Sequence, residues 1–153
     1  SMERLSTGKR INSASDDAAG VAIASRLTSE IKGTNQAIRN AQDAQGLINT
    51  AEGAHKEVEN ILQRMRELAV QSANDTNSSS DRDNLEAEYN ALSTEIDRIA
   101  DVTTWAGQNL LDGTGDFDIQ VGGGTNGADT VNVAIDAIDS GTLLLQANLA
   151  SAG

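Results

Sequence analysis

The sequence predicts a mainly α-helical fold with a small β part (α+β), namely a long helical hairpin of coiled-coil type followed by a β-hairpin region. Apolar residues recur at steps of three and four over residues 15–103, as one face of a helix requires, and the chain contains no Pro. A run of turn-forming residues at 75–80 divides this pattern in two. Over residues 104–136 the pattern changes to alternation between Gly-rich stretches, which is typical of short strands.

The chain begins with an irregular lead-in over residues 3–14. A first helix is predicted to start at Ser15, whose side chain can accept hydrogen bonds as an N-cap. Asp16 and Asp17 follow in the first turn, where carboxylates suit the positive end of the helix dipole. The helix is expected to run to about residue 74, and at about 1.5 Å per residue it would be a rod of roughly 85 Å.

The first helix carries a heptad seam, a line of apolar and small side chains with spacings of four and three. One three-residue stammer near Ala44 interrupts the repeat. A single solvated helix has no use for such a line, so this helix is expected to pack against other helices. The seam comprises Leu27, Ile31, Thr34, Ile38, Ala41, Ala44, Leu47, Ala51, Ala54, Val58, Ile61, Met65 and Leu68.

A second helix is predicted after the loop at 75–80 and is expected to end near Val102. Ser80 is expected to cap it, with Asp81 and Asp83 in its first turn. Two heptad stripes joined by a short loop predict an antiparallel helical hairpin. The second stripe comprises Leu85, Tyr89, Leu92, Ile96, Ile99 and Thr103.

Two alternating runs, at 117–121 and 131–135, predict the β-hairpin of the 104–136 region. Asn126 followed by Gly127 is a turn signal between them. The tail at 137–153 contains three consecutive Leu residues and then small residues, and it is expected to be irregular.

The composition limits the classes of function. The chain has 153 residues, 38% of them hydrophobic, and only three aromatic residues, which favours a thin, rod-like core. The net charge of −12 argues against binding to nucleic acid or to an anionic membrane. No apolar run is long enough to insert into a membrane, and the absence of Cys excludes disulfides and thiolate chemistry.

Several short motifs are weak. The pattern Gly122-x-Gly124-x-x-Gly127 lacks the following helix that a dinucleotide site needs, since a strand is expected there. The acidic stretch 112–118 resembles a calcium loop only faintly, without a suitable Glu. His55 is the single His and has no partners at metal-ligand spacing. No metal, cofactor, catalytic residue or enzymatic activity is therefore predicted.

Two N-x-[ST] matches, at Asn74 and Asn77, lie in the predicted helix–helix loop. They would mark glycosylation only in a eukaryotic secretory context, and a plain loop explains them as well.

The end of the first helix has a polar outer face. On a helical wheel Arg64, Glu67 and Gln71 point well away from Met65. Asn60, Gln63 and Asn74 lie beside them. The pattern alone describes a mixed-charge, solvated face.

The segments RINSASDDAAG (residues 10–20) and LQRMRELAVQSAN (residues 62–74) are similar to the N-terminal part of bacterial flagellin, the filament subunit. The resemblance extends from ERLSTG (residues 3–8) through EIDRIAD (residues 95–101) to FDIQVG (residues 117–122). It covers residues 3–135.

The resemblance implies that residues 15–103 supply two N-terminal helices of the flagellin rod domain, with a β region beside them. Flagellins also possess inner-tube segments at both ends and a C-terminal rod helix, which are expected to be absent here. The resemblance further implies an extracellular flagellar location, with export through the flagellar secretion apparatus and without a cleaved signal peptide. The alternative is a hook-associated, flagellin-like junction protein.

The resemblance implies two kinds of partner. The first is other flagellin subunits, which form a homopolymer in the full-length protein and serve motility. The packing residues would be Arg10, Ile11, Asp16, Asp17, Leu47, Val58, Ile61, Met65, Leu85, Leu92 and Ile96. The second is a flagellin-sensing Toll-like receptor of innate immunity. The residues that match its contact region are Gln63, Arg64, Glu67, Leu68, Gln71 and Glu88.

Overall fold

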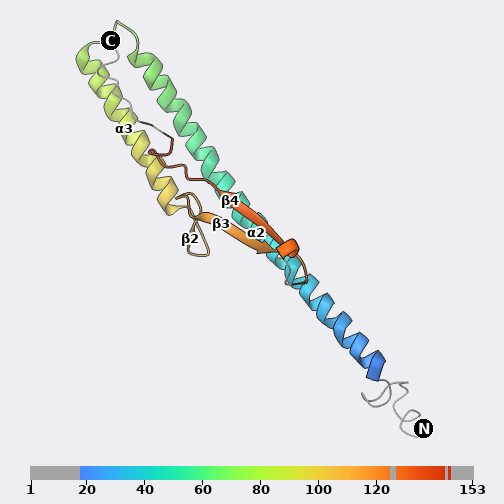
Figure 1. Cartoon of the computed structure of the whole chain (residues 1–153). Helices are drawn as coiled ribbons and strands as arrows, with labels where there is room; N and C mark the ends of the chain where they lie inside the picture. Colours follow the sequence, from blue (N-terminus) through green and yellow to red (C-terminus); the bar gives the residue numbers. More distant parts are fainter. Residues whose placement is uncertain (1–17, 125–126, 144, 146–153) are drawn as a thin grey trace. The chain divides into compact units, whose positions relative to one another are not determined.

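The computed structural model describes residues 18–124, 127–143 and 145 of the chain (Figure 1). The described residues fall into two compact units, one within residues 1–42 and 119–131 and the other within residues 43–118 and 132–153. The elements in chain order are α2 (Ala18–Ser72), α3 (Ser79–Val102), β1 (Thr104–Trp105), β2 (Gln108–Asn109), β3 (Gly115–Gln120), the 3₁₀ helix η1 (Gly127–Asp129) and β4 (Thr130–Ile135).

The predicted fold class is confirmed. Two long helices separated by a short loop are followed by two small sheets, β1–β2 and β3–β4. The helix α3 ends at Val102, and Thr103, the last residue of the second heptad stripe, is its C-cap. The predicted start of the first helix at Ser15, with Asp16 and Asp17, lies outside the described residues.

In the second unit α2 and α3 pack together through a helix–helix core. Its buried members are Val58, Met65 and Leu68 from α2 and Tyr89 and Ile96 from α3. These residues occupy the two predicted heptad stripes, so burial of the stripes against each other holds the hairpin together. Other stripe residues are partly buried around this core, namely Ile61, Leu85, Leu92 and Ile99.

A second cluster, the β-side core, joins α2 to the β part of the same unit. Leu47 and Ala51 of α2 lie there with Ala100, Leu110 and Leu111. Strand residues Trp105, Phe117, Val133 and Ile135 pack against this cluster as partly buried neighbours. The middle part of the seam, at Leu47 and Ala51, therefore packs against the β region.

The short hairpin β1–β2 is a feature that the sequence reading did not predict. Thr104 pairs with Asn109 and Trp105 with Gln108 in an antiparallel register. The two turn residues, Ala106 and Gly107, both have positive φ, at 49° and 82°. A two-residue hairpin turn of this kind matches the strand twist, and Gly adopts it without a steric cost.

The described residues that follow β4 are fixed to the helices. Asp97 of α3 accepts hydrogen bonds from the backbone N–H (2.7 Å) and the hydroxyl (2.9 Å) of Ser140. Ile138, Leu143 and Leu145 pack against the helix–helix core. The carboxylate of Asp97 thus fixes the segment whose three apolar side chains pack on the helix–helix core.

In the first unit the loop after β3 lies against α2. The side-chain amide of Asn40 donates to the carbonyl of Gln120 at 3.0 Å. Gly33 lies so close to Gly123 that a Cβ at Gly33 would be 3.1 Å from the Gly123 carbonyl oxygen. Close backbone approach therefore accounts for this helix Gly.

The first part of the predicted seam is exposed. Leu27, Ile31 and Ile38 are 47%, 61% and 53% exposed, and Ile23 joins them at 54%. We call Ile23, Leu27, Ile31 and Ile38 the exposed stripe. The seam is buried within the chain only from Leu47 onward.

Replacement of Gly46 by Ala is expected to disturb the β-side core. The added Cβ would lie 2.7 Å from Cη2 of Trp105, so the indole ring would have to move. Gly53→Ala is a matched control, because nothing lies within 4 Å of its added Cβ. In that open position Ala favours the helix over Gly by about 1 kcal/mol.

We expect Gly46→Ala to be less stable than Gly53→Ala by about 1–3 kcal/mol in urea unfolding. Its fluorescence emission should also shift, because Trp105 is the single Trp of the chain. Equal unfolding free energies with unchanged emission would contradict the packing of Gly46 against Trp105.

Candidate functional site

The most organised polar feature of the second unit is an ion-pair bridge between the two helices. Arg64 of α2 donates from Nε (2.9 Å) and Nη2 (2.7 Å) to Oε1 of Glu88 on α3. Its Nη1 donates to Oε2 of Glu67 at 3.2 Å, one helical turn along α2. The hydrogen bonds to Glu88 and then to Glu67 raise the pKa of Arg64 above its usual value.

This bridge orients side chains more than it stabilises the fold. The side chains of Arg64 and Glu88 are 48% and 45% exposed, and solvated ion pairs contribute little to stability. The planar guanidinium is nevertheless held from two directions, which limits the rotamers it can adopt. Together with the exposed Gln63 and Gln71, these residues form what we call the recognition face: Gln63, Arg64, Glu67, Gln71 and Glu88.

The loop beside this face is closed by side-chain caps. Ser78 is the N-cap of α3 and forms a capping box with Asp81, whose carboxylate accepts from the backbone N–H of Ser78 at 2.9 Å. The prediction of Ser80 as the cap is therefore wrong. Both Ser78 and Ser80 have an Asp three residues later, and the structure uses the earlier pair, which lengthens α3 by two residues.

Asn77 closes the other side of the loop. Its side-chain amide donates to the carbonyl of Gln71 in the last turn of α2 (2.6 Å) and to that of Asn74 in the loop (3.1 Å). The side-chain oxygen of Asn74 accepts from the backbone N–H of Thr76 at 3.2 Å, as in an Asx turn. Capping and turn formation account for both Asn residues of the N-x-[ST] matches.

A small polar groove of about 260 Å³ lies between the loop and the recognition face. Its lining comes from the end of α2, the loop and one face of α3, namely Gln71, Asn77, Asp81, Asn84, Leu85 and Glu88. Gln71 and Glu88 belong to the recognition face as well, so the groove continues that surface.

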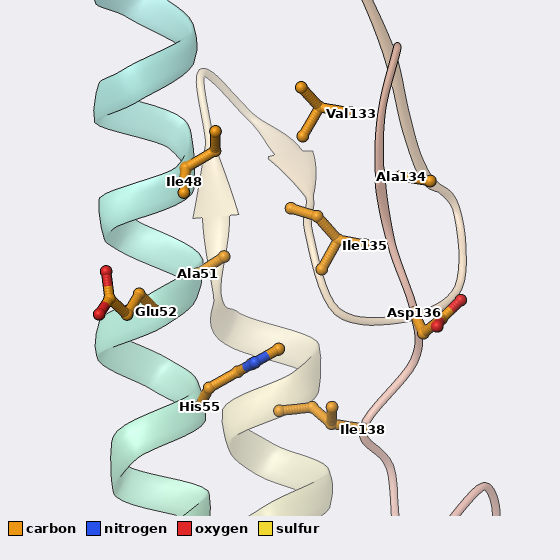
Figure 2. Close-up of a pocket in the computed structure, with 9 residues that line it drawn as sticks. All are labelled: Ile48, Ala51, Glu52, His55, Val133, Ala134, Ile135, Asp136 and Ile138. Atoms are coloured by element: carbon orange, nitrogen blue, oxygen red, sulfur yellow. The ribbon is translucent and has the colours of Figure 1, made fainter.

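A larger groove of about 530 Å³ lies between α2 and the segment around β4 in the second unit (Figure 2). Its walls are mostly aliphatic, with Ile48 and Ala51 on one side and Val133, Ile135 and Ile138 on the other. Figure 2 shows the His55 ring directed toward Ile138, whereas the Glu52 carboxylate is directed away from the groove. The described residues contain no group of three or more His, Cys, Asp or Glu that could hold a metal ion.

A sequence profile described as the bacterial flagellin N-terminal helical region matches residues 1–116. The chain belongs to the bacterial flagellin family. Flagellin B of Vibrio anguillarum is 53% identical over 123 residues, which cover 80% of this chain and 33% of that protein. A flagellin of Salmonella paratyphi A is 51% identical over 142 residues, which cover 93% of this chain and 28% of that protein.

The fold agrees with solved flagellins. The crystal structure of Bacillus cereus flagellin aligns with a TM-score of 0.56 at 40% identity, covering 69% of this chain and 60% of that one. Flagellins are structural proteins rather than enzymes, in agreement with the absence of a predicted catalytic set. The chain spans about a third or less of the length of the two sequence relatives above.

One residue of the flagellin-derived receptor set is buried. Leu68 has an exposed fraction of 0% and belongs to the helix–helix core. On the helical wheel it lies near the edge of the seam, and the approach of α3 covers it. The other five residues of that set are exposed and lie on the recognition face.

The packing set is divided between described and undescribed residues. Leu47, Val58, Met65 and Ile96 are buried, and Ile61, Leu85 and Leu92 are partly buried, all within the two cores. Arg10, Ile11, Asp16 and Asp17 lie outside the described residues.

The weak motifs take structural roles. Gly127 begins the three-residue 3₁₀ helix η1, after which β4 follows, so the helix that a dinucleotide fingerprint requires is not formed there. Asp116 and Asp118 both accept from the side-chain amide of Asn132, across the β3–β4 sheet. Within the described ranges, no helix combines the length and apolarity needed to span a membrane.

Replacement of Ser78 by Ala should destabilise the protein by about 1 kcal/mol, because α3 loses its N-cap. Ser80→Ala is the matched control and should be neutral or slightly stabilising, since Ser80 lies inside the helix, where Ala is favoured. Thermal unfolding followed by circular dichroism measures both. A larger loss of stability for Ser80→Ala than for Ser78→Ala would indicate that Ser80 is the N-cap.

The effect of Ser78→Ala should depend on pH. The hydrogen bonds from the Ser78 hydroxyl and backbone N–H lower the pKa of Asp81 below its usual value. This contribution to stability is present above the unfolded-state pKa of about 3.9 and is lost as the pH falls through the lower pKa of the folded protein. The difference in stability between Ser78→Ala and the unmodified protein should therefore become smaller in acid. A constant difference down to pH 2 would contradict this role of the Ser78–Asp81 hydrogen bonds.

Proposed function

We propose that this chain acts as the N-terminal rod part of a flagellin, a structural subunit of the extracellular flagellar filament. The proposal rests on the match to the flagellin N-terminal region over residues 1–116. The exposed stripe supports the proposal, because four aliphatic side chains on one helical face offer a packing surface to a neighbouring helix. Other flagellin subunits would be the principal partners, and export would use the flagellar secretion apparatus without a cleaved signal peptide.

The alternative within the family is a hook-associated, flagellin-like junction protein. Such a protein would occupy the base of the filament rather than its length. Antibody labelling of filaments viewed by electron microscopy separates the two, because a filament subunit labels the whole length.

The exposed stripe gives a direct test of the filament proposal. Leu27→Glu combined with Ile31→Glu should abolish filaments when the protein that carries this sequence is expressed in cells lacking their own flagellin. Ser25→Glu combined with Ser29→Glu is the matched control, because these exposed residues lie on the opposite side of the same helical turns. The control should still form filaments and swim, and normal filaments from the stripe variant would contradict the proposal.

We also propose that a flagellin-sensing Toll-like receptor docks on the recognition face. The supporting observation is the preorganised bridge of Arg64 to Glu88, which fixes charged groups on an exposed surface without burying them. A side chain that is already ordered loses less conformational entropy when a partner binds. In this proposal Arg64 contacts the receptor, and Glu88 contributes partly by holding Arg64 in place.

A double-mutant cycle tests this arrangement. Arg64→Ala should weaken receptor binding by at least about tenfold, as expected for an Arg at the centre of an interface. Glu88→Ala should weaken it as well, but should add much less in the Arg64→Ala background, because its positioning role is then lost. Binding is measured with the purified receptor ectodomain.

Arg66→Ala is the control for this cycle, because Arg66 is an exposed Arg on a different side of α2. Unchanged binding by Arg64→Ala would refute the receptor proposal. Fully additive losses for Arg64→Ala and Glu88→Ala would refute the positioning role of Glu88.

A further inference from the structure

The polar groove next to the recognition face has the chemistry of an acceptor site. Its two ionisable residues, Asp81 and Glu88, are both acidic. The amides of Gln71, Asn77 and Asn84 supply further carbonyl oxygens. No Lys or Arg is among the lining residues. Arg64, beside the groove, offsets the charge of Glu88, so Asp81 supplies the negative charge that favours a basic group.

The carboxylates are only partly used within the chain. The capping box uses Oδ2 of Asp81, and the bridge to Arg64 uses Oε1 of Glu88. In the described part of the chain the second oxygens, Oδ1 of Asp81 and Oε2 of Glu88, make no hydrogen bond. Each residue is thus held in place by one oxygen and can accept from a partner with the other.

The size and the floor of the groove suit one long side chain. Its volume of about 260 Å³ is below the roughly 300–1,000 Å³ of small-molecule pockets. Leu85 supplies an apolar surface between Asp81 and Glu88. Lys and Arg side chains pack their aliphatic stems on such a surface while the charged end meets carboxylates.

We propose that the groove binds a basic side chain, Lys or Arg, of the protein that docks on the recognition face. This inference rests on the proposed receptor function and adds the chemistry of the partner. The groove and the recognition face share Gln71 and Glu88, so one docking event covers both. Across the combined surface Arg64 is opposed by three carboxylates, those of Glu67, Glu88 and Asp81, which makes a basic partner complementary.

Asn84 is the residue with which to test the charge of the groove, because it is exposed and lies between Asp81 and Glu88 on the same face of α3. Asn84→Lys places a positive charge in the groove and should weaken binding of the receptor ectodomain at least about tenfold. Asn84→Met has similar bulk without the charge and should cost much less. Asn84→Asp should bind at least as tightly as the unmodified protein, more so at low salt.

Asn90→Lys is the matched control, since it makes the same chemical change at an exposed position of α3 that does not line the groove. Its binding should stay within about twofold of the unmodified protein. Unfolding midpoints of all variants confirm that they fold. Binding by Asn84→Lys equal to that of Asn90→Lys, or an equal loss for Asn84→Met, would overturn the groove proposal while the receptor proposal stands. No binding by the unmodified protein would overturn both.

Discussion

The packing of α2 against α3 is the interaction on which the rest of the second unit depends. Val58, Met65 and Leu68 can be buried only if α3 presents Tyr89 and Ile96 to them, and this fixes the rotation of both helices about their axes. Every outward-facing residue then takes its direction from the buried layer. The buried positions stabilise the hairpin through the hydrophobic effect, while the polar face adds order rather than stability.

The bridge of Arg64 to Glu88 illustrates this dependence. The two residues are 24 positions apart, so they meet only because the helix–helix core sets the register between α2 and α3. A slip of one helical turn, about 5.4 Å, would separate the charges and leave Glu67 as the nearer partner of Arg64. The geometry of the Arg64–Glu88 bridge thus depends on the packing of the helix–helix core.

The sequence predicted the helices and their hairpin because heptad periodicity is sustained over many turns, where a single exception changes little. It did not predict β1–β2, since two-residue strands are too short to show alternation. The contact of Asp97 with Ser140 was also missed, because it joins residues 43 positions apart and neither has a distinctive local pattern. For the site, helical phase placed Gln63, Arg64, Glu67 and Gln71 on the outer face of the first helix, and these residues are exposed. Glu88 came only from the flagellin resemblance. The spacing placed Leu68 in the seam, where it is buried, and only the resemblance made it a receptor contact.

The seam itself has two outcomes along one helix. The same apolar spacing is buried at Val58 and Leu68 and exposed at Leu27 and Ile31. Periodicity specifies that a face is suited to packing, but the partner decides whether it is covered, and the 24 residues of α3 can face only part of the 55 residues of α2. In the filament proposal the exposed stripe serves contacts between chains, whereas the recognition face lies on polar residues that the core leaves outside. Because the two surfaces use different residues of α2, we expect substitutions to affect the proposed filament contact and the proposed receptor docking independently.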